Sequence, residues 1–402
     1  MHILLTGGGT AGHVIPNIAI AAAIKEFNPA ARITYIGSYN GIERRLCEEA
    51  NIPFEGVHTG KLRRYFDVRN FGDIFKIPVG AVQAFFKLLR HRPKVVFSKG
   101  GYVGFPVVFA AWLLGIPVMI HESDAIPGLA TKMCAPFAQK IFLGYEAAAE
   151  ALNHVANKLE VVGNPVRLDL YDGKITVAKK WTGFSGKRPV LLVMGGSSGS
   201  LELNKKIEKQ KKELMKVYDI VHVTGEGKST RSKSIPSNNK SYVSVPFVGE
   251  KLKDLYALAS LALTRAGAGT LAELEALQIP ALLFPLGTHA SRGDQIANAQ
   301  ALCKKSNLYR LGEDVPTLLS QLAKLPARPT RHVENSATER IALTLLSEPP
   351  RTGNSEFQIG INSLMSPCSV REPLCTSPPL IRPLYLEFRI SFTTSFPGFP
   401  YH

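Results

Sequence analysis

The chain has 402 residues, 45% of them hydrophobic and 20% charged, which is the balance of a soluble globular protein with room for two domains. Its formal net charge of +16 fits either general solubility or attraction to an anionic ligand or surface, such as a nucleotide, a diphosphate or a membrane. We recognise no DNA- or RNA-binding motif, so nucleic acid is not expected as a partner.

Two further features of the composition indicate the compartment. The five cysteines are scattered without the spacing of metal ligands, which is typical of free thiols in a reducing compartment. A predicted strand begins within the first residues and leaves no room for a signal peptide, and no charge-free apolar stretch is long enough to cross a bilayer. We therefore expect a cytoplasmic protein, peripheral to a membrane at most.

The first 163 residues alternate between short apolar runs and helical patterns. Helices are predicted at residues 16–27 and 41–50, and strands at residues 3–5, 33–36, 94–97, 118–120, 140–142 and 159–162. Buried parallel strands have this continuous Val, Ile and Leu composition, and the alternation is that of βαβ units. The pattern predicts an α/β domain with a doubly wound parallel sheet.

A glycine-rich loop, GGGTAGH at residues 7–13, joins the first predicted strand to the first helix. Glycine allows a tight turn and a close ligand approach, and the helix start offers unpaired N–H groups to an anion. A dinucleotide cofactor is disfavoured because the second strand ends in Gly37 and Ser38, without the acidic residue that binds ribose. His13 closes the loop, either as a capping or packing residue or as a general base for a sugar hydroxyl.

The segment 75–94 combines apolar and basic side chains at helical spacing. One interpretation is a helix whose apolar face lies in the core and whose basic side is solvated. The other is a membrane-surface patch, in which apolar groups enter the bilayer and cations meet anionic lipid. Lys61, Arg63 and Arg64 add positive charge just upstream.

The segment GNPVR at residues 163–167 breaks the pattern and is predicted to be a hinge. Beyond it, strands are predicted at residues 190–194, 220–224, 242–246, 261–264 and 281–285, and an amphipathic helix at residues 337–346. We therefore predict two Rossmann-like domains, residues 1–163 and 164–330, that face each other across a cleft. The last helix, about residues 331–348, is able to pack back on the first domain. Residues 351–402 contain no Ala, Lys or Asp and are predicted to be disordered or foreign to the fold.

The second domain repeats the strand, glycine loop and helix arrangement. GGSSG at residues 195–199 follows one strand, and RAGAGTLAE at residues 265–273 follows another. We expect Glu273 in the first turn of the next helix, where its carboxylate either binds both hydroxyls of a ribose or compensates the helix dipole. GDQIAN at residues 293–298 places acids and amides where they suit the hydroxyls of a sugar.

The sequence contains no Asp-x-Asp pair, although enzymes that hold a sugar-nucleotide diphosphate through a metal use such acids. We therefore expect neither a metal nor a cofactor. Helix dipoles, backbone N–H groups and Arg167 would neutralise the departing diphosphate instead.

Six motifs occur in order: the loop at 7–13, SKGGYV at 98–103, HESD at 121–124, GNPVR at 163–167, GGS at 195–197 and the run at 265–273. Together they resemble the MurG family of bacterial peptidoglycan N-acetylglucosaminyltransferases, over roughly residues 1–348. The resemblance implies the GT-B fold, two Rossmann-like domains with the active site between them. It also implies inverting transfer of N-acetylglucosamine from UDP-N-acetylglucosamine to undecaprenyl-diphospho-N-acetylmuramoyl-pentapeptide, on the inner face of the plasma membrane.

The same resemblance assigns roles to individual residues. His13 is the candidate base, and Asp124, where many family members have Asn, contacts substrate and is either a second candidate base or the group that orients His13. Acceptor-side and diphosphate contacts carry over to Thr10, Ala11 and Gly12. Donor contacts carry over to Arg167, Ser197, Val248 (uracil), Ala268, Gly269, Thr270, Leu271, Ala272, Glu273 (ribose) and Gln295 (sugar).

Three alternative functions are consistent with parts of this pattern. One is a glycosyltransferase of the same architecture that acts on another lipid, such as diacylglycerol. Another is an inactive nucleotide-sugar-binding subunit. A degenerate copy would have lost some of the predicted site residues, so the joint presence of four of them argues against it: His13, Arg167, Glu273 and Gln295. The third, a sugar-nucleotide epimerase, would require acids in the cleft that the sequence does not place there.

Overall fold

The computed structural model describes residues 1–60, 69–196, 199–228, 241–287, 293–314, 317–330 and 336–347, with the backbone alone for residues 69–75. Several sequence predictions fall outside these residues. They are the basic Lys61, Arg63 and Arg64, the donor contact Ser197 and the tail at residues 351–402.

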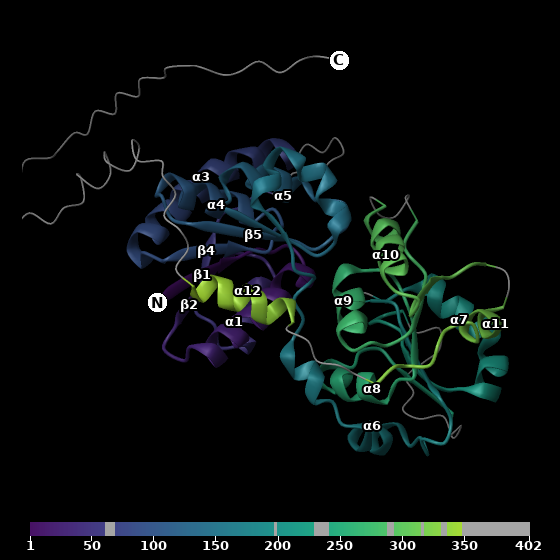
Figure 1. Cartoon of the computed structure of the whole chain (residues 1–402). Coiled ribbons are helices and arrows are strands. Elements are labelled where there is room, and N and C mark those ends of the chain that lie inside the picture. Colours follow the sequence, from purple (N-terminus) through teal and green to yellow (C-terminus); the bar gives the residue numbers. More distant parts are fainter. Residues whose placement is uncertain are drawn as a thin grey trace, which may run out of the picture. The chain divides into compact units, whose positions relative to one another are not determined.

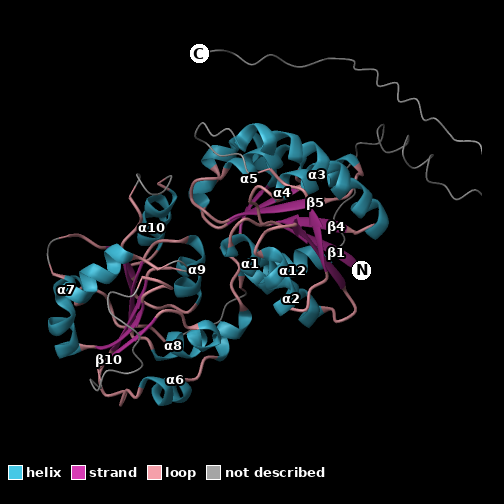
Figure 2. Ribbon diagram, turned by 180° about the vertical axis from the view of Figure 1, so that it is seen from behind, coloured by secondary structure: helices cyan, strands magenta, loops and turns pink. Residues whose placement is uncertain are grey.

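Within the described residues, the first sheet has seven parallel strands in the order β3-β2-β1-β4-β5-β6-β7. Figure 2 labels three of its central strands, β1, β4 and β5. The strands are β1 (His2–Thr6), β2 (Arg32–Ser38), β3 (Phe54–Val57), β4 (Val95–Ser98), β5 (Val118–Glu122), β6 (Lys140–Leu143) and β7 (Leu159–Val161). Every residue of β1, β4 and β5 is buried, as expected for strands covered on both faces. The sequence does not predict β3, because its residues FEGV give neither an apolar run nor a regular alternation.

Helices cover both faces of the first sheet (Figure 1). One face carries α3 (Arg69–His91), α4 (Gly104–Leu113) and α5 (Leu129–Cys134), and the other carries α1 (Ala11–Phe27) and α12 (Ala337–Leu346). The remaining helices are α2 (Glu43–Glu49) and the short η1 (Ala135–Phe137), η2 (Glu146–Ala148) and η3 (Glu150–Lys158). Helix α1 begins five residues before the predicted start, because Pro16 lies inside the helix instead of opening it.

The second sheet has six parallel strands among the described residues, in the order β10-β9-β8-β11-β12-β13. They are β8 (Val190–Met194), β9 (Asp219–Val223), β10 (Tyr242–Val245), β11 (Leu261–Thr264), β12 (Ala281–Leu283) and β13 (Tyr309–Leu311). The helices are η4 (Leu168–Asp172), α6 (Ile175–Thr182), α7 (Leu201–Val217), η5 (Gly249–Lys251), α8 (Leu252–Leu258), α9 (Ala268–Ala276), α10 (Asp294–Lys305) and α11 (Leu318–Leu322). The three-residue β13 carries no signal that the sequence analysis recognised.

Helix α12 closes the core of the first sheet with residues from the far end of the described chain. Its Ile341, Ala342 and Leu345 are fully buried in the same apolar cluster as residues of β1 and α1. A capping box between Ser336 and Glu339 starts the helix, as the sequence pattern of such boxes requires. Thr338 Oγ1 accepts a hydrogen bond from the backbone N–H of Val166 (2.9 Å) and donates one to the carbonyl of Val166 (2.7 Å). Helix α12 is therefore also fixed to the segment that connects the two sheets.

Both sheets reverse their strand order at one point, between β1 and β4 in the first and between β8 and β11 in the second. At such a point the loops after neighbouring strands diverge, and ligands of α/β proteins bind in the crevice that results. The glycine loop at residues 7–13 follows β1, and the Lys99–Gly101 turn follows β4. The glycines at residues 195–196 follow β8, and the run at 265–273 follows β11, so all the predicted glycine motifs lie at these two points.

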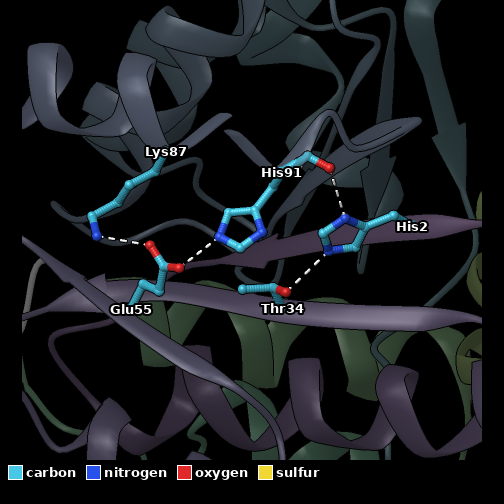
Figure 3. Close-up of polar contacts among 5 residues, drawn as sticks. All are labelled: His2, Thr34, Glu55, Lys87 and His91. Atoms are coloured by element: carbon cyan, nitrogen blue, oxygen red, sulfur yellow. Dashed lines mark hydrogen bonds and ion pairs between the residues drawn. The ribbon is translucent and has the colours of Figure 1, made fainter. Parts of the chain in front are cut away.

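Helix α3 is fastened to the first sheet by a chain of polar contacts far from these loops (Figure 3). The Glu55 carboxylate on β3 accepts hydrogen bonds from Lys87 Nζ (2.7 Å) and His91 Nε2 (2.6 Å). His2 Nδ1 donates to the His91 carbonyl (3.0 Å), which leaves His2 Nε2 to accept the Thr34 hydroxyl (3.0 Å). Burial alone would raise the pKa of Glu55, but the bonds from Lys87 and His91 outweigh it and hold that pKa below its usual range.

We find no helix in the described part of the chain that is both long and apolar enough to cross a membrane.

Candidate active site

The loop at residues 7–13 is held in shape by a buried carboxylate. Glu43, which is fully buried, accepts hydrogen bonds from the backbone N–H of Gly9 (2.7 Å) and from the Ser38 hydroxyl. Gly9 has a φ of +90°, which other residues rarely adopt, and a side chain on Gly8 would collide with the Glu43 carboxylate. Gly8 and Gly9 are therefore required by the packing of the loop itself.

The first turn of α1 is open to an anion. Thr10 is the residue before the helix and its side chain makes no capping hydrogen bond, and the first turn contains no acidic residue. Thr10 and Gly12 are exposed and Ala11 is half-buried. The N-terminal N–H groups and the positive end of the helix dipole favour a phosphoryl group at this position.

The loop after β4 packs directly against the loop after β1. The backbone N–H of Gly8 donates to the Gly100 carbonyl (3.2 Å), and a side chain on Gly101 would collide with the Gly8 carbonyl. Gly101 also has a φ of +80°. The two loops thus form one rigid unit in which backbone meets backbone.

His13 is oriented by this unit. Its Nδ1 lies 3.2 Å from the Lys99 carbonyl oxygen. A carbonyl only accepts hydrogen bonds, so Nδ1 carries the proton of the neutral ring and the basic lone pair is on Nε2. This is the tautomer that a general base needs.

A cavity of about 230 Å³ opens beside these loops, and both His13 and Asp124 line it. The other polar or charged side chains in its wall are those of Lys99, Tyr102, Glu122 and Thr131, and apolar side chains such as Phe105, Leu129 and Met133 complete it. Glu122 accepts hydrogen bonds from the backbone N–H groups of Asp124 (3.0 Å) and Gly128 (2.9 Å), which fixes the turn that carries Asp124.

Lys99 is a buried cation in the wall of this cavity, with 1% of its surface exposed. Its Nζ donates to His121 Nδ1 (2.9 Å) and to the Ser123 hydroxyl, so His121 is neutral and donates from Nε2 to the Gly163 carbonyl (2.9 Å). Burial lowers the pKa of Lys99 to about 8, although the charges of Glu122 and Asp124 oppose the shift. Burial, followed by the Lys99 charge, lowers the pKa of His121 well below its usual range.

Asn298 of α10 connects to the HESD motif. Its Oδ1 accepts the backbone N–H of Ala125 (2.7 Å), and its Nδ2 donates to Asp124 Oδ1 (2.9 Å). Asn298 is fully buried, so these bonds are shielded from water.

In the second domain the two glycine-rich turns differ, since a side chain on Gly195 or Gly199 would collide with the backbone of Ser200 or Thr224. Gly196 has a φ of +80°, and a side chain on Gly267 or Gly269 would meet no atom of the described residues within 4 Å. Helix α9 follows Gly267 with no side-chain cap and no acid in its first turn, which again suits an anion.

Glu273 lies in the second turn of α9, so the expectation of the first turn is wrong. The helix already begins at Ala268, inside the glycine-rich run, because Gly267 has the extended backbone of a residue before a helix. The Tyr256 hydroxyl donates to Glu273 Oε2 (2.6 Å). Burial raises the pKa of Glu273, and the Tyr256 bond and the nearby charge of Arg167 oppose that shift.

The remaining predicted donor residues lie around the same sheet. Arg167 is one-third exposed, with its Nε 3.7 Å from Asp169 Oδ1. Gln295 Oε1 accepts the backbone N–H of Leu286 (3.0 Å), and Val248 is half-buried against the core. The other predicted donor residues lie in the first turns of α9. Ala268 and Thr270 are half-buried there, Gly269 is exposed, and Leu271 and Ala272 are buried.

Residues 3–143 match the N-terminal domain of glycosyltransferase family 28, and residues 190–343 match its C-terminal domain. The chain belongs to glycosyltransferase family 28. It is 44% identical over 314 residues, 78% of this chain and 86% of the relative, to a protein of Lachnoclostridium phytofermentans named UDP-N-acetylglucosamine–N-acetylmuramyl-(pentapeptide) pyrophosphoryl-undecaprenol N-acetylglucosamine transferase. A protein of Geobacillus kaustophilus with the same name is 46% identical over 303 residues, 75% of this chain and 83% of the relative.

Solved structures agree with this membership. The crystal structure of Acinetobacter baumannii MurG matches with a TM-score of 0.64 and 25% identity, over 86% of this chain and 99% of that one. A UDP-GlcNAc 2-epimerase of Methanocaldococcus jannaschii matches with a TM-score of 0.59 at 18% identity, over 86% of this chain and 99% of that one, which shows a shared fold alone. The predicted fold class, the resemblance and the assignment as a glycosyltransferase are confirmed.

Sequence reasoning assigned no individual role to three side chains of this family 28 chain: Lys99 and Asn298 entered it only as members of the motifs at residues 98–103 and 293–298, and Tyr256 not at all. Lys99, Tyr256 and Asn298 bind residues 17 to 174 positions away in the chain, and only the folded structure brings those partners together. In the part of the chain that the structure describes, no cluster of three or more His, Cys, Asp or Glu side chains is arranged to hold a metal ion.

Proposed function

We propose that this chain transfers N-acetylglucosamine from UDP-N-acetylglucosamine to undecaprenyl-diphospho-N-acetylmuramoyl-pentapeptide, with inversion at the anomeric carbon. The single observation that supports this most strongly is the 44% identity to a relative named for that reaction, over 86% of the relative's length. The product is the lipid-linked disaccharide precursor of peptidoglycan.

In the proposed mechanism, His13 is the general base. The acceptor hydroxyl gives its proton to His13 Nε2 as its oxygen attacks the anomeric carbon from the face opposite UDP. The bond between His13 Nδ1 and the Lys99 carbonyl supports this role, because it fixes the tautomer and stabilises the imidazolium that forms. Asp124, in the wall of the same cavity, is the second candidate base.

We assign donor binding to residues 164–330 and acceptor binding to residues 1–163. The leaving diphosphate meets the uncapped first turn of α9 and the Arg167 guanidinium, whose charges stabilise the developing anion. Glu273 binds the ribose, Val248 the uracil through its backbone, and Gln295 the donor sugar. Thr10, Ala11 and Gly12 bind the diphosphate of the acceptor at the start of α1.

The test is a transfer assay with the full chain, labelled UDP-N-acetylglucosamine and the lipid-linked muramoyl-pentapeptide. We expect a labelled lipid-linked disaccharide with an inverted anomeric centre. Diacylglycerol serves as the control acceptor, and transfer to diacylglycerol alone would replace this proposal by a glycosyltransferase with another lipid acceptor. Binding of UDP-N-acetylglucosamine without any transfer would indicate a non-catalytic subunit.

We further propose that the protein works at the cytoplasmic face of the plasma membrane, bound through α3 and α4. Val79, Val82 and Phe86 lie one helical turn apart on α3 and are 49%, 57% and 64% exposed. Trp112 on the neighbouring α4 is 42% exposed, and the exposed basic residues Lys76 and Arg90 belong to α3. Apolar groups with flanking cations are the composition of a membrane-surface helix.

Sedimentation with vesicles tests this surface. We expect binding to vesicles that contain phosphatidylglycerol, weaker binding to phosphatidylcholine vesicles, and a loss of several-fold in Phe86→Ser. Leu343→Ser is the matched control, because Leu343 is 50% exposed on α12. Equal binding of both variants would contradict the assignment of this surface.

A further inference from the structure

Tyr256 of α8, which is buried, and Glu273 of α9, which is half-buried, form a hydrogen-bonded pair. Tyr256 lies on α8 with 1% of its surface exposed, and its hydroxyl donates to Glu273 Oε2 at 2.6 Å. Among the described residues no group donates to the other carboxylate oxygen, Oε1. One oxygen of the carboxylate is thus anchored by the protein, and the other is available to a ligand.

The backbone that carries this pair is held together by one side chain. The Arg328 guanidinium donates to the carbonyls of Tyr256 (2.7 Å), Ala259 (2.8 Å) and Leu277 (2.9 Å). Ala259 ends α8 and Leu277 ends α9, so the two helices are fixed at their carboxyl ends. The Tyr256 hydroxyl and the Glu273 carboxylate therefore meet in one defined arrangement.

The hydrogen bond from Tyr256 also favours the ionised form of the carboxylate. Burial acts in the opposite direction, since it raises the pKa of Glu273. An ionised acceptor binds a hydroxyl more strongly than a neutral one does. The tyrosine thus controls both the direction and the charge of the group.

We propose that Tyr256 is a positioning residue that aims Glu273 Oε1 at a ribose hydroxyl of the donor and thereby makes the site prefer ribonucleotide over deoxyribonucleotide sugars. This inference rests on the proposed function, which assigns the donor to residues 164–330. A site built to bind a substrate hydroxyl discriminates strongly against the analogue that lacks it.

The test compares UDP-N-acetylglucosamine with its 2′-deoxy and 3′-deoxy analogues in the wild type and in Tyr256→Phe. We expect the variant to lose about tenfold in kcat/KM for UDP-N-acetylglucosamine through a higher KM, with kcat and the acceptor KM unchanged. For one of the deoxy analogues, kcat/KM should fall little in Tyr256→Phe, so the preference of the variant for the ribonucleotide is smaller than that of the wild type. A merely structural role would lower kcat/KM for all three donors alike.

Tyr242→Phe is the matched control. Tyr242 is also buried, and its hydroxyl bonds His222 Nδ1 (2.8 Å) in the same sheet, away from Glu273. We expect its donor preference to equal that of the wild type. Glu273→Gln is the second variant, and it should lose the same preference for the ribonucleotide. Adding Tyr256→Phe to Glu273→Gln should not change that preference further.

The outcomes separate the two proposals. If the wild type binds no UDP in calorimetry, the proposed donor function is wrong and this inference falls with it. If the wild type binds UDP but the preference is unchanged in Tyr256→Phe, or in Glu273→Gln should Tyr256→Phe not fold, the inference alone is overturned.

Discussion

The two points of reversed strand order share a topology but differ in how their glycines are used. At the β1/β4 point, side chains on Gly8, Gly9 or Gly101 would collide with Glu43, Tyr102 or the Gly8 carbonyl. At the β8/β11 point, side chains on Gly195 and Gly199 would also collide with backbone, of Ser200 and Thr224, whereas side chains on Gly267 and Gly269 would meet no described atom within 4 Å. Glycine is thus needed by the protein's own packing in the loops after β1, β4 and β8, whereas at the start of α9 it leaves room for something else.

The charged groups differ in the same way. The first point is lined by a buried lysine, two carboxylates and His13, which the fold holds in place through many bonds. At the second, the first turn of α9 has no side-chain cap and no acid, and one oxygen of the Glu273 carboxylate is anchored by Tyr256. A cavity lined by several titratable side chains suits proton transfer, and the open first turn of α9 suits a nucleotide phosphate, so the comparison supports a division of labour between the two.

Replacing His13 should give the clearest difference between the two points of reversed strand order, because it should affect turnover and not donor binding. We expect His13→Ala to lose about 10²- to 10⁴-fold in kcat, because proton removal from the acceptor is lost. Its dissociation constant for UDP-N-acetylglucosamine should stay within about threefold, because we assign donor binding to the second point. Steady-state kinetics and calorimetry measure the two quantities. Near-normal turnover would remove His13 from the base role and leave Asp124 as the candidate.

Adding one methyl group at each point tests the contrast between the glycines. Gly101→Ala should lower the free energy of unfolding by about 2–4 kcal/mol, since φ is +80° and the new side chain meets the Gly8 carbonyl. Gly269→Ala should leave stability unchanged or raise it by up to about 1 kcal/mol, because alanine favours the helix. It should instead weaken UDP binding by roughly tenfold.

Urea unfolding and calorimetry give both values for the glycine variants. The contrast is refuted if the two variants lose equal stability, or if Gly269→Ala binds UDP as the wild type does.

The buried lysine predicts a pH dependence of stability. Burial lowers the pKa of Lys99 from 10.5 to about 8, so between these pH values the unfolded chain binds a proton that the folded chain does not. The free energy of unfolding should therefore rise across this window, by roughly 3 kcal/mol in total, and Lys99→Met should lack that rise. Lys216→Met, at a side chain that is 68% exposed, is the control. Parallel pH curves for the wild type and Lys99→Met would refute the prediction.

The smallest effect is expected far from both points, at the contacts that hold α3 (Figure 3). Glu55→Gln should cost about 1 kcal/mol of unfolding free energy at pH 7, because the bonds from Lys87 and His91 lose their charge. The pKa of Glu55 is lowered in the folded chain, so its contribution is present above the unfolded pKa and is lost as the pH falls through the folded one. Urea unfolding at pH 7 and pH 3 should show a difference that disappears in acid, with UDP binding unaffected at pH 7.

The sequence predicted most of the architecture because local patterns determine it. Apolar runs located eleven strands, and the helix at residues 337–346 has the predicted bounds. The short edge strands β3 and β13 escaped, since three or four residues with mixed polarity carry no periodic signal. The position of Glu273 was wrong by one turn because glycine can end a loop or start a helix, and packing decides between the two.

The candidate site was predicted only in part, for a related reason. Glycine loops and the histidine that closes the first one are contiguous in the chain and were recognised as a unit. Lys99, Tyr256 and Asn298 act through partners distant in sequence, and the residues near each of them give no sign of those partners. A lysine next to two glycines looks like an ordinary surface residue until the fold buries it.

The position of α12 has a consequence for biosynthesis. Ile341, Ala342 and Leu345 are buried in the apolar core on one face of the first sheet. The ribosome adds them only after the whole second sheet has been made. Domains fold as units while the chain emerges, and exposed apolar surface on an incomplete one attracts chaperones. The first sheet of the nascent chain must therefore stay partly uncovered until nearly 350 codons have been read. The domain that is translated first is the one whose core is completed last.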